Sequence, residues 1–182
     1  TYILPKDKNT TTNLEANLLG IDTNKHFRTS FFYYQDFGIS GDSLDFEGIF
    51  KNDYVKRVDY CNYFILNLFG KEENITLHLP EQKCFSQSVI KVAEKTMKGT
   101  FKGSKNISID FEKSFKVRIK IKNKILELFI NDKKLSDIEY KNNIGKTIGI
   151  QCIFSSSGGI ENVSIKNSHN QLPVYEKYFK TE

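Results

Sequence analysis

The stretch that decides the fold is Phe115-Lys-Val-Arg-Ile-Lys-Ile-Lys-Asn-Lys-Ile-Leu-Glu-Leu-Phe-Ile-Asn131. Its first half alternates apolar and basic residues, and a period of two places successive side chains on opposite faces of a strand. A second apolar run starts at Ile125, directly after the polar pair Asn123 and Lys124. Two β-rich runs joined by a short turn that contains Asn are typical of a hairpin. The segment therefore predicts two antiparallel strands with one buried face.

Short β-rich runs bounded by Gly, Asn, Asp and Lys continue on both sides of this hairpin. Runs of this kind, without a helical period between them, indicate a sandwich or barrel and not alternating β-α units. The sequence predicts an all-β protein with two antiparallel sheets and no convincing helix. We expect strands over Phe31–Gln35, Ser43–Phe50, Tyr63–Phe69, Asn74–Leu79, Ser88–Val92, Phe115–Lys122, Ile125–Asn131, Thr147–Phe154 and Ile160–Lys166.

A chain of 182 residues is of ordinary length for one all-β domain. We expect a partly ordered N-terminal extension over residues 1–29, the sandwich over 30–167 and a tail over 168–182. The tail is apolar enough to pack on the domain or on a partner, through Val174, Tyr175, Tyr178 and Phe179. Extension and tail are both candidates to cover a sheet edge.

Charge and hydropathy bear on two possibilities, an anionic partner and a membrane span. The net charge of +5 comes mainly from Lys, so it is weak support for an anionic partner. The longest apolar stretch, residues 63–69, is far shorter than the roughly 18 to 20 residues of a membrane-spanning helix, so no membrane span is predicted.

The three cysteines, Cys61, Cys84 and Cys152, are odd in number and widely spaced. This pattern matches neither a disulfide framework nor a zinc motif, and it predicts mainly free thiols. Free thiols favour a cytoplasmic location, whereas four Asn-x-Ser/Thr sequons leave secretion open, so the compartment is not decided. The sequons start at Asn9, Asn74, Asn106 and Asn162.

Several segments resemble the strands of galectins, in the same order. The first are Gly41-Asp-Ser-Leu-Asp-Phe-Glu-Gly48, Asn62-Tyr-Phe-Ile-Leu-Asn-Leu68 and Asn74-Ile-Thr-Leu-His-Leu79; Ser88–Val92, Ile109–Phe111 with Phe115–Ile119, and Leu126–Asn131 follow. The resemblance covers about residues 33–166. It implies a two-sheet jelly-roll sandwich of the galectin-like, concanavalin A-like class. Another jelly-roll family, of the legume-lectin or laminin-G type, is the alternative.

The galactoside site of that family is altered here. His78 matches the family's strand His, but Pro80 stands at its Asn, and Gln82, or Lys83 with a shift, stands near its Arg. Lys91 or Val92 takes the place of the next Asn. Residues 97–103 contain no Trp, Glu or Arg, although Phe101 offers a ring for stacking. The resemblance thus implies a glycan groove of His78, Gln82, Lys91 and Phe101, with a specificity other than lactose.

A basic row is the second candidate site. Lys116, Arg118, Lys120 and Lys122 share one face of their strand, where they could dock an acidic protein, an anionic lipid or a sulfated glycan. A solvated outer face is the alternative. Nucleic acid is not expected, because the rings of this stretch face inward and would not stack on bases.

Catalytic and metal chemistry find little support in the sequence. His26, His78 and His169 are too far apart to suggest a metal site. The carboxylates Asp42, Asp45, Glu47, Glu72 and Glu73 include no evident acid–base pair. We expect no enzyme activity, no metal and no cofactor.

The sequence therefore favours a non-catalytic interaction module that binds a protein partner or scaffolds a complex, within a larger assembly or longer chain. The alternative is a carbohydrate-binding lectin with altered glycan specificity.

Overall fold

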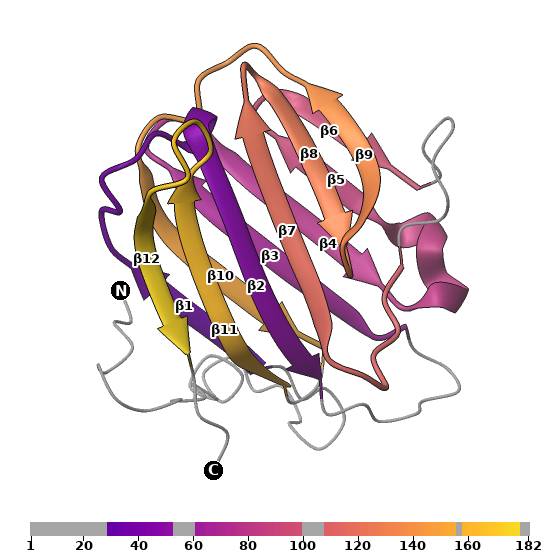
Figure 1. The fold of residues 1–182 in the computed structure, drawn as a ribbon. Helices are drawn as coiled ribbons and strands as arrows, with labels where there is room; N and C mark the ends of the chain where they lie inside the picture. Colours follow the sequence, from indigo (N-terminus) through magenta and orange to yellow (C-terminus); the bar gives the residue numbers. More distant parts are fainter. Residues whose placement is uncertain (1–28, 53–60, 100–107, 156–157, 179–182) are drawn as a thin grey trace, which may run out of the picture.

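A computed structural model describes residues 29–52, 61–99, 108–155 and 158–178 (Figure 1). Nearly all of this part is β-structure, with two short 3-10 helices. The elements are β1 (Thr29–Tyr34), η1 (Gly41–Ser43), β2 (Leu44–Asn52), β3 (Tyr63–Gly70), β4 (Asn74–Pro80), η2 (Gln82–Gln87), β5 (Val89–Val92), β6 (Lys95–Lys98), β7 (Phe115–Lys122), β8 (Ile125–Ile130), β9 (Lys133–Glu139), β10 (Thr147–Phe154), β11 (Gly158–Asn167) and β12 (Pro173–Tyr178).

The strands form two antiparallel six-stranded sheets that lie face to face (Figure 1). The β4 sheet has the order β1-β10-β3-β4-β5-β6, and the β7 sheet has the order β12-β11-β2-β7-β8-β9. The inner strands bury alternate side chains, as Ile75, Leu77 and Leu79 do on β4. The predicted all-β jelly-roll sandwich is confirmed.

The hairpin that decided the sequence-based prediction is present. Strands β7 and β8 pair in antiparallel register from Val117 opposite Ile130 to Lys122 opposite Ile125. Asn123 and Lys124 between them both have positive φ, 53° and 61°, as a type I′ turn requires. On β7 the side chains of Phe115, Val117, Ile119 and Ile121 are buried.

The core centres on four phenylalanines, two from each sheet. Phe50 of β2 and Phe115 of β7 meet Phe64 of β3 and Phe154 of β10; the ring centroids lie 4.6 Å apart for Phe50–Phe64, 5.2 Å for Phe64–Phe115 and 5.1 Å for Phe64–Phe154. All four are almost fully buried. Gly48 makes room for them, because a Cβ there would collide with the ring of Phe50.

Three strands were not predicted: β6, β9 and β12. Strands β6 and β9 lie at one edge of their sheets and β12 at another. Edge strands are short and rich in Lys, which blunts their unpaired backbone groups against aggregation. Such segments lack the clean alternation that marks a half-buried strand, so their sequence resembles a loop.

Strand β12 lies in the range predicted as the tail. It pairs with β11, and Tyr175 packs against Tyr33 and Phe37, with ring centroids 5.5 Å and 5.4 Å apart. Burial raises the pKa of Tyr175 to about 12. Strand β12 therefore covers one edge of the sandwich beside β1 (Figure 1). The predicted extension and Phe179 lie outside the described residues.

The prediction that the cysteines are mainly free is wrong. Cys61, just before β3, and Cys84, in η2, form a disulfide with their Cα atoms 6.0 Å apart. Cys152 is the free cysteine and is buried; burial raises the pKa of its thiol. Spacing in the sequence could not reveal the pair, because the turn of the chain through β3 and β4 brings the two residues together.

Asp42, in η1, fixes the loop between β9 and β10. Its carboxylate accepts hydrogen bonds from Lys124 Nζ (2.9 Å), Tyr140 Oη (2.8 Å) and the Ile144 backbone N–H (3.2 Å). Partial burial acts to raise the pKa of Asp42, but the bonds from Lys124, Tyr140 and Ile144 outweigh it, so the pKa lies below its ordinary value. Burial, together with the hydrogen bond to Asp42, raises the pKa of Tyr140.

Loss of the disulfide should destabilise the domain. The bond closes a loop with a sequence separation of 23, and a loop of this length corresponds to about 3 kcal/mol. We expect Cys61→Ala/Cys84→Ala to lose about this free energy of unfolding in a urea titration. A reductant should lower the stability of the wild type to that of the variant and leave the variant unchanged. Equal stability of wild type and variant would show that the bond does not form.

Neutralising Asp42 should destabilise the domain in a pH-dependent way. Because the folded-state pKa is depressed, the carboxylate stabilises the fold fully above its unfolded-state pKa of about 3.9. That contribution is lost as the pH falls through the lower folded-state pKa. We expect Asp42→Asn to lose about 1–3 kcal/mol at pH 6, and less at pH 3, in urea unfolding. The control is Asp137→Asn, which removes an exposed ion pair with Lys134 and should cost under about 1 kcal/mol.

Candidate functional site

The outer surface of the β4 sheet is the first candidate site. We define the β4 face as the outward side chains of that sheet, which alternate with buried ones along each strand. The pairing of the strands places these side chains in rows across the sheet. The β4 face consists of Ser30, Phe32, Tyr34, Gln151, Ile153, Tyr63, Ile65, Asn67, Phe69, Asn74, Thr76, His78, Val89, Lys91, Thr96 and Lys98.

One row of the β4 face carries five hydrogen-bonding side chains. It runs across the six strands as Phe32, Gln151, Asn67, Thr76, Lys91 and Thr96. Asn67 Nδ2 donates to Gln151 Oε1 over 3.0 Å, and Gln151 Nε2 donates to Ser30 Oγ over 3.4 Å. The two amides thus orient each other, while Asn67 Oδ1 accepts no hydrogen bond from the described residues.

The neighbouring row contains His78. Its ring lies 5.2 Å from the ring of Tyr63, at an angle of 35°. Its Nδ1 is 2.8 Å from the backbone oxygen of Gln87; since a carbonyl oxygen only accepts, Nδ1 is the donor. Its Nε2 is then left for a ligand. Val89 and Lys98 continue this row on β5 and β6.

Two of the four predicted groove residues share the β4 face. His78 on β4 and Lys91 on β5 are outward, and Lys91 is exposed. Gln82 is exposed too, but β4 ends at Pro80 and Gln82 belongs to η2, so it does not continue the row of Thr76 and His78. Phe101 lies outside the described residues.

Tyr63, Asn67 and Gln151 of the β4 face were not among the predicted groove residues. Tyr63 and Asn67 are outward positions of β3, and their alternation with Phe64, Leu66 and Leu68 was a usable signal. Gln151 on β10 gave no such signal: it reaches Asn67 only because a strand that is distant in sequence pairs with β3.

The predicted basic row lies on the outer surface of the β7 sheet and is partly neutralised. Arg118 donates two bonds to the buried Asp45, of 2.8 Å and 2.7 Å, and these bonds raise the pKa of Arg118. Lys116 lies 2.6 Å from Asp132. Lys120 and Lys122 form no ion pair with the described residues, but Lys120 is opposite Asp45 on β2 and Glu127 on β8.

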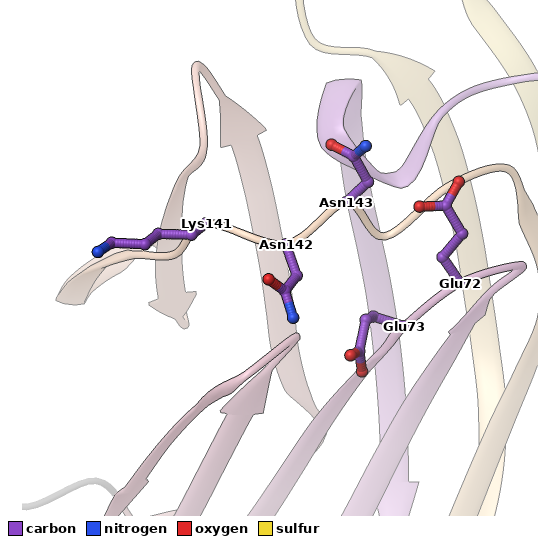
Figure 2. A pocket seen from close by; sticks show the side chains of 5 residues that line it. All are labelled: Glu72, Glu73, Lys141, Asn142 and Asn143. Atoms are coloured by element: carbon purple, nitrogen blue, oxygen red, sulfur yellow. The ribbon is translucent and has the colours of Figure 1, made fainter.

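An open cleft of about 400 Å³ lies where the β3–β4 turn meets the β9–β10 loop (Figure 2). The side chains of Glu72 and Glu73 come from the turn, and those of Asn142 and Asn143 from the loop, whereas Lys141 extends away from them. The backbone N–H groups of Glu72 and Glu73 both donate to Ile144 O. The cleft is thus a polar gap between two loops that are hydrogen-bonded to each other.

Within the described ranges, no group of three or more His, Cys, Asp or Glu side chains is arranged to hold a metal ion. No helix in the same ranges is long and apolar enough to cross a membrane.

Comparison with known sequences gives no relative. No model of a protein family matches the chain, and no curated protein matches it either.

Comparison with solved structures finds sandwiches of the same kind. A tetrameric galectin from the ball sponge Cinachyrella sp. has a TM-score of 0.50 at 14% identity, over 75% of this chain and 98% of that one. The carbohydrate binding module CBM66 from Bacillus subtilis has a TM-score of 0.51 at 9% identity, over 76% and 84%. The carbohydrate recognition domain of Emp47p has a TM-score of 0.51 at 10% identity, over 77% and 78%.

Identities of this size show the fold alone. The resemblance to galectins seen in the sequence therefore holds at the level of the fold, which galectins share with other lectin and carbohydrate-binding domains. The chain has a galectin-like lectin fold, a two-sheet antiparallel jelly roll.

Proposed function

We propose that this protein is a non-catalytic carbohydrate-binding module that holds a glycan on the β4 face. The observation that carries the proposal is the row of Gln151, Asn67, Thr76 and Lys91, which lies beside the ring pair Tyr63–His78. Sugars present hydroxyl groups around an apolar ring face. They are bound by side chains that donate and accept hydrogen bonds beside an aromatic surface.

Hydrogen bonds fix the amide side chains of Asn67 and Gln151 in positions from which they can bind hydroxyl groups. The bond from Asn67 to Gln151 and the bond from Gln151 to Ser30 restrict both side chains. A side chain already held in place loses less conformational entropy when a ligand binds. Asn67 Oδ1 and the second N–H of each amide remain for the sugar.

The disulfide and the fold support the same proposal. Structural disulfides such as Cys61–Cys84 persist in oxidising compartments and outside cells, where glycans are displayed. The structural neighbours include proteins named as a galectin, a carbohydrate binding module and a carbohydrate recognition domain.

A galactoside of the kind that galectins bind is not the proposed ligand. The chain contains no Trp, and the described arginine, Arg118, is bound to Asp45 on the other sheet. Each missing hydrogen bond to a charged group is worth about 1.5–3 kcal/mol. The ligand is therefore a glycan that suits amide, hydroxyl and Lys contacts.

The non-catalytic part of the proposal rests on how the carboxylates are used. Asp42 holds Lys124, Tyr140 and the Ile144 backbone, and Asp45 holds Arg118. Carboxylates that make such structural bonds are not available as a general acid and base.

Protein binding, the function favoured by the sequence, is the second candidate. Its support is the apolar exposure beside β12: Leu172 is 61% exposed and Val174 is 37% exposed. A protein partner would cover these side chains, which lie away from the β4 face at the edge of the other sheet.

Removing the two amides should weaken glycan binding without unfolding the domain. Two neutral hydrogen bonds contribute about 0.5–1.5 kcal/mol each, so Asn67→Ala/Gln151→Ala should bind the best ligand from a glycan array about 5- to 150-fold more weakly. Titration calorimetry measures the affinity, and thermal unfolding checks the fold. The control, Lys120→Gln/Lys122→Gln on the β7 sheet, should bind as the wild type does. If no glycan binds, or if the variant binds normally, the proposal fails.

A further inference from the structure

We infer that the glycan held on the β4 face is anionic, with sulfate or carboxylate groups on its sugars. This inference deepens the proposed function and rests on it. The two outer surfaces of the sandwich differ in the pairing of their charges. Several cations on the β7 sheet lie beside carboxylates, whereas the described lysines of the β4 face do not.

The β4 face has cationic groups and no carboxylate. Among its described side chains are Lys91 and Lys98, and none is Asp or Glu. Lys91 and Lys98 are exposed and form no ion pair with the described residues. The face is therefore a region of positive potential, which attracts anions.

Two carboxylates that lie close in sequence to β4 and β5 are occupied elsewhere. Glu81, after the end of β4, is buried and accepts a hydrogen bond from Asn62 while it lies 2.7 Å from Lys83. Glu94, in the β5–β6 turn, accepts bonds from the backbone N–H groups of Lys141 and Asn142, which lower its pKa. Neither is placed among the outward side chains that surround Lys91 and Lys98.

The other sheet shows that this arrangement is not a general property of the fold. On the β7 sheet, Lys116, Arg118 and Lys134 each lie within 2.7 Å of a carboxylate, on Asp132, Asp45 and Asp137 respectively. The same chain thus pairs three cations of one surface with carboxylates, whereas Lys91 and Lys98 on the β4 face form no ion pair with the described residues.

The two lysines are close enough to act on one ligand. Lys91 is opposite Thr96, and Lys98 is two residues further along the same strand. Diagonal neighbours of this kind lie about 7–8 Å apart. Like charges at such a spacing repel each other, although salt weakens the effect. An anionic group bound between them relieves that repulsion and gains charge-assisted hydrogen bonds.

The neighbouring groups favour a sugar as the carrier of the anion. Along one row, Asn67 and Thr76 lie between Gln151 and Lys91. Side chains that can bind hydroxyl groups are therefore direct neighbours of the Lys91 ammonium group. The β4 face thus pairs contacts for sugar hydroxyls with a contact for a charged substituent. An anion alone would not use the amides.

The test is a glycan array built from matched sets, in which each neutral glycan appears also in a sulfated and in a carboxylated form. We expect the full chain to bind anionic members at least tenfold better than their neutral counterparts, with a preference that weakens as salt rises. The two anionic arms distinguish sulfate from carboxylate. Equal binding of neutral and anionic members would overturn the inference and leave the proposed function intact. Binding to no glycan would overturn both.

Matched charge variants test whether the anionic glycan binds at the β4 face or is attracted to any basic surface of the protein. Lys91→Gln/Lys98→Gln and Lys120→Gln/Lys122→Gln remove the same charge from opposite sheets. We expect the first to weaken the binding of the anionic glycan by tenfold or more and the second to change it less than twofold. Equal losses, or none in the first variant, would contradict the inference. Binding to acidic proteins or nucleic acid as strongly as to the glycan would contradict it too.

Discussion

The contact of Phe50 and Phe115 with Phe64 and Phe154 is the interaction on which the rest of the structure depends. It joins β2 and β7 of one sheet to β3 and β10 of the other. Deleting a buried ring of this kind typically costs about 3–5 kcal/mol, a large share of the stability of a domain. Because the inner faces hold the sheets together, the outer side chains are free to serve other purposes. Both candidate surfaces consist of such outer side chains.

The two outer surfaces use this freedom differently. On the β7 sheet, the buried Asp45 requires a partner, since an uncompensated charge in the interior is strongly destabilising, and Arg118 supplies it through two bonds. The charges there serve the structure of the sheet itself. On the β4 face, the amides of Asn67 and Gln151 bind each other, while Lys91 and Lys98 form no ion pair within the described part of the chain. This difference in charge pairing makes the β4 face the better ligand surface.

Local cross-links at the ends of the strands keep the β4 face in shape. The Cys61–Cys84 disulfide ties η2 to the start of β3, and Gln87 in η2 accepts the bond from His78 that orients the imidazole. At the opposite end, Asp42 fixes the β9–β10 loop, whose Ile144 carbonyl accepts bonds from the β3–β4 turn. Neither cross-link touches the proposed ligand, but both hold the strands that carry its contacts.

The sequence alone determined the all-β class, because alternation such as that of Phe115–Lys122 is a local consequence of strand geometry. Through the resemblance to galectins it also proposed His78 and Lys91 as groove residues, and both occupy outward positions of the β4 sheet. Only the tertiary structure decided that Gln151 lies beside Asn67, that Cys61 bonds to Cys84 and that Asp45 neutralises Arg118. Each of these contacts joins residues far apart in the chain, and which strands become neighbours depends on how the whole core packs. Edge strands such as β6 and β9 escaped prediction because they bury little, so their residues carry almost no periodic signal.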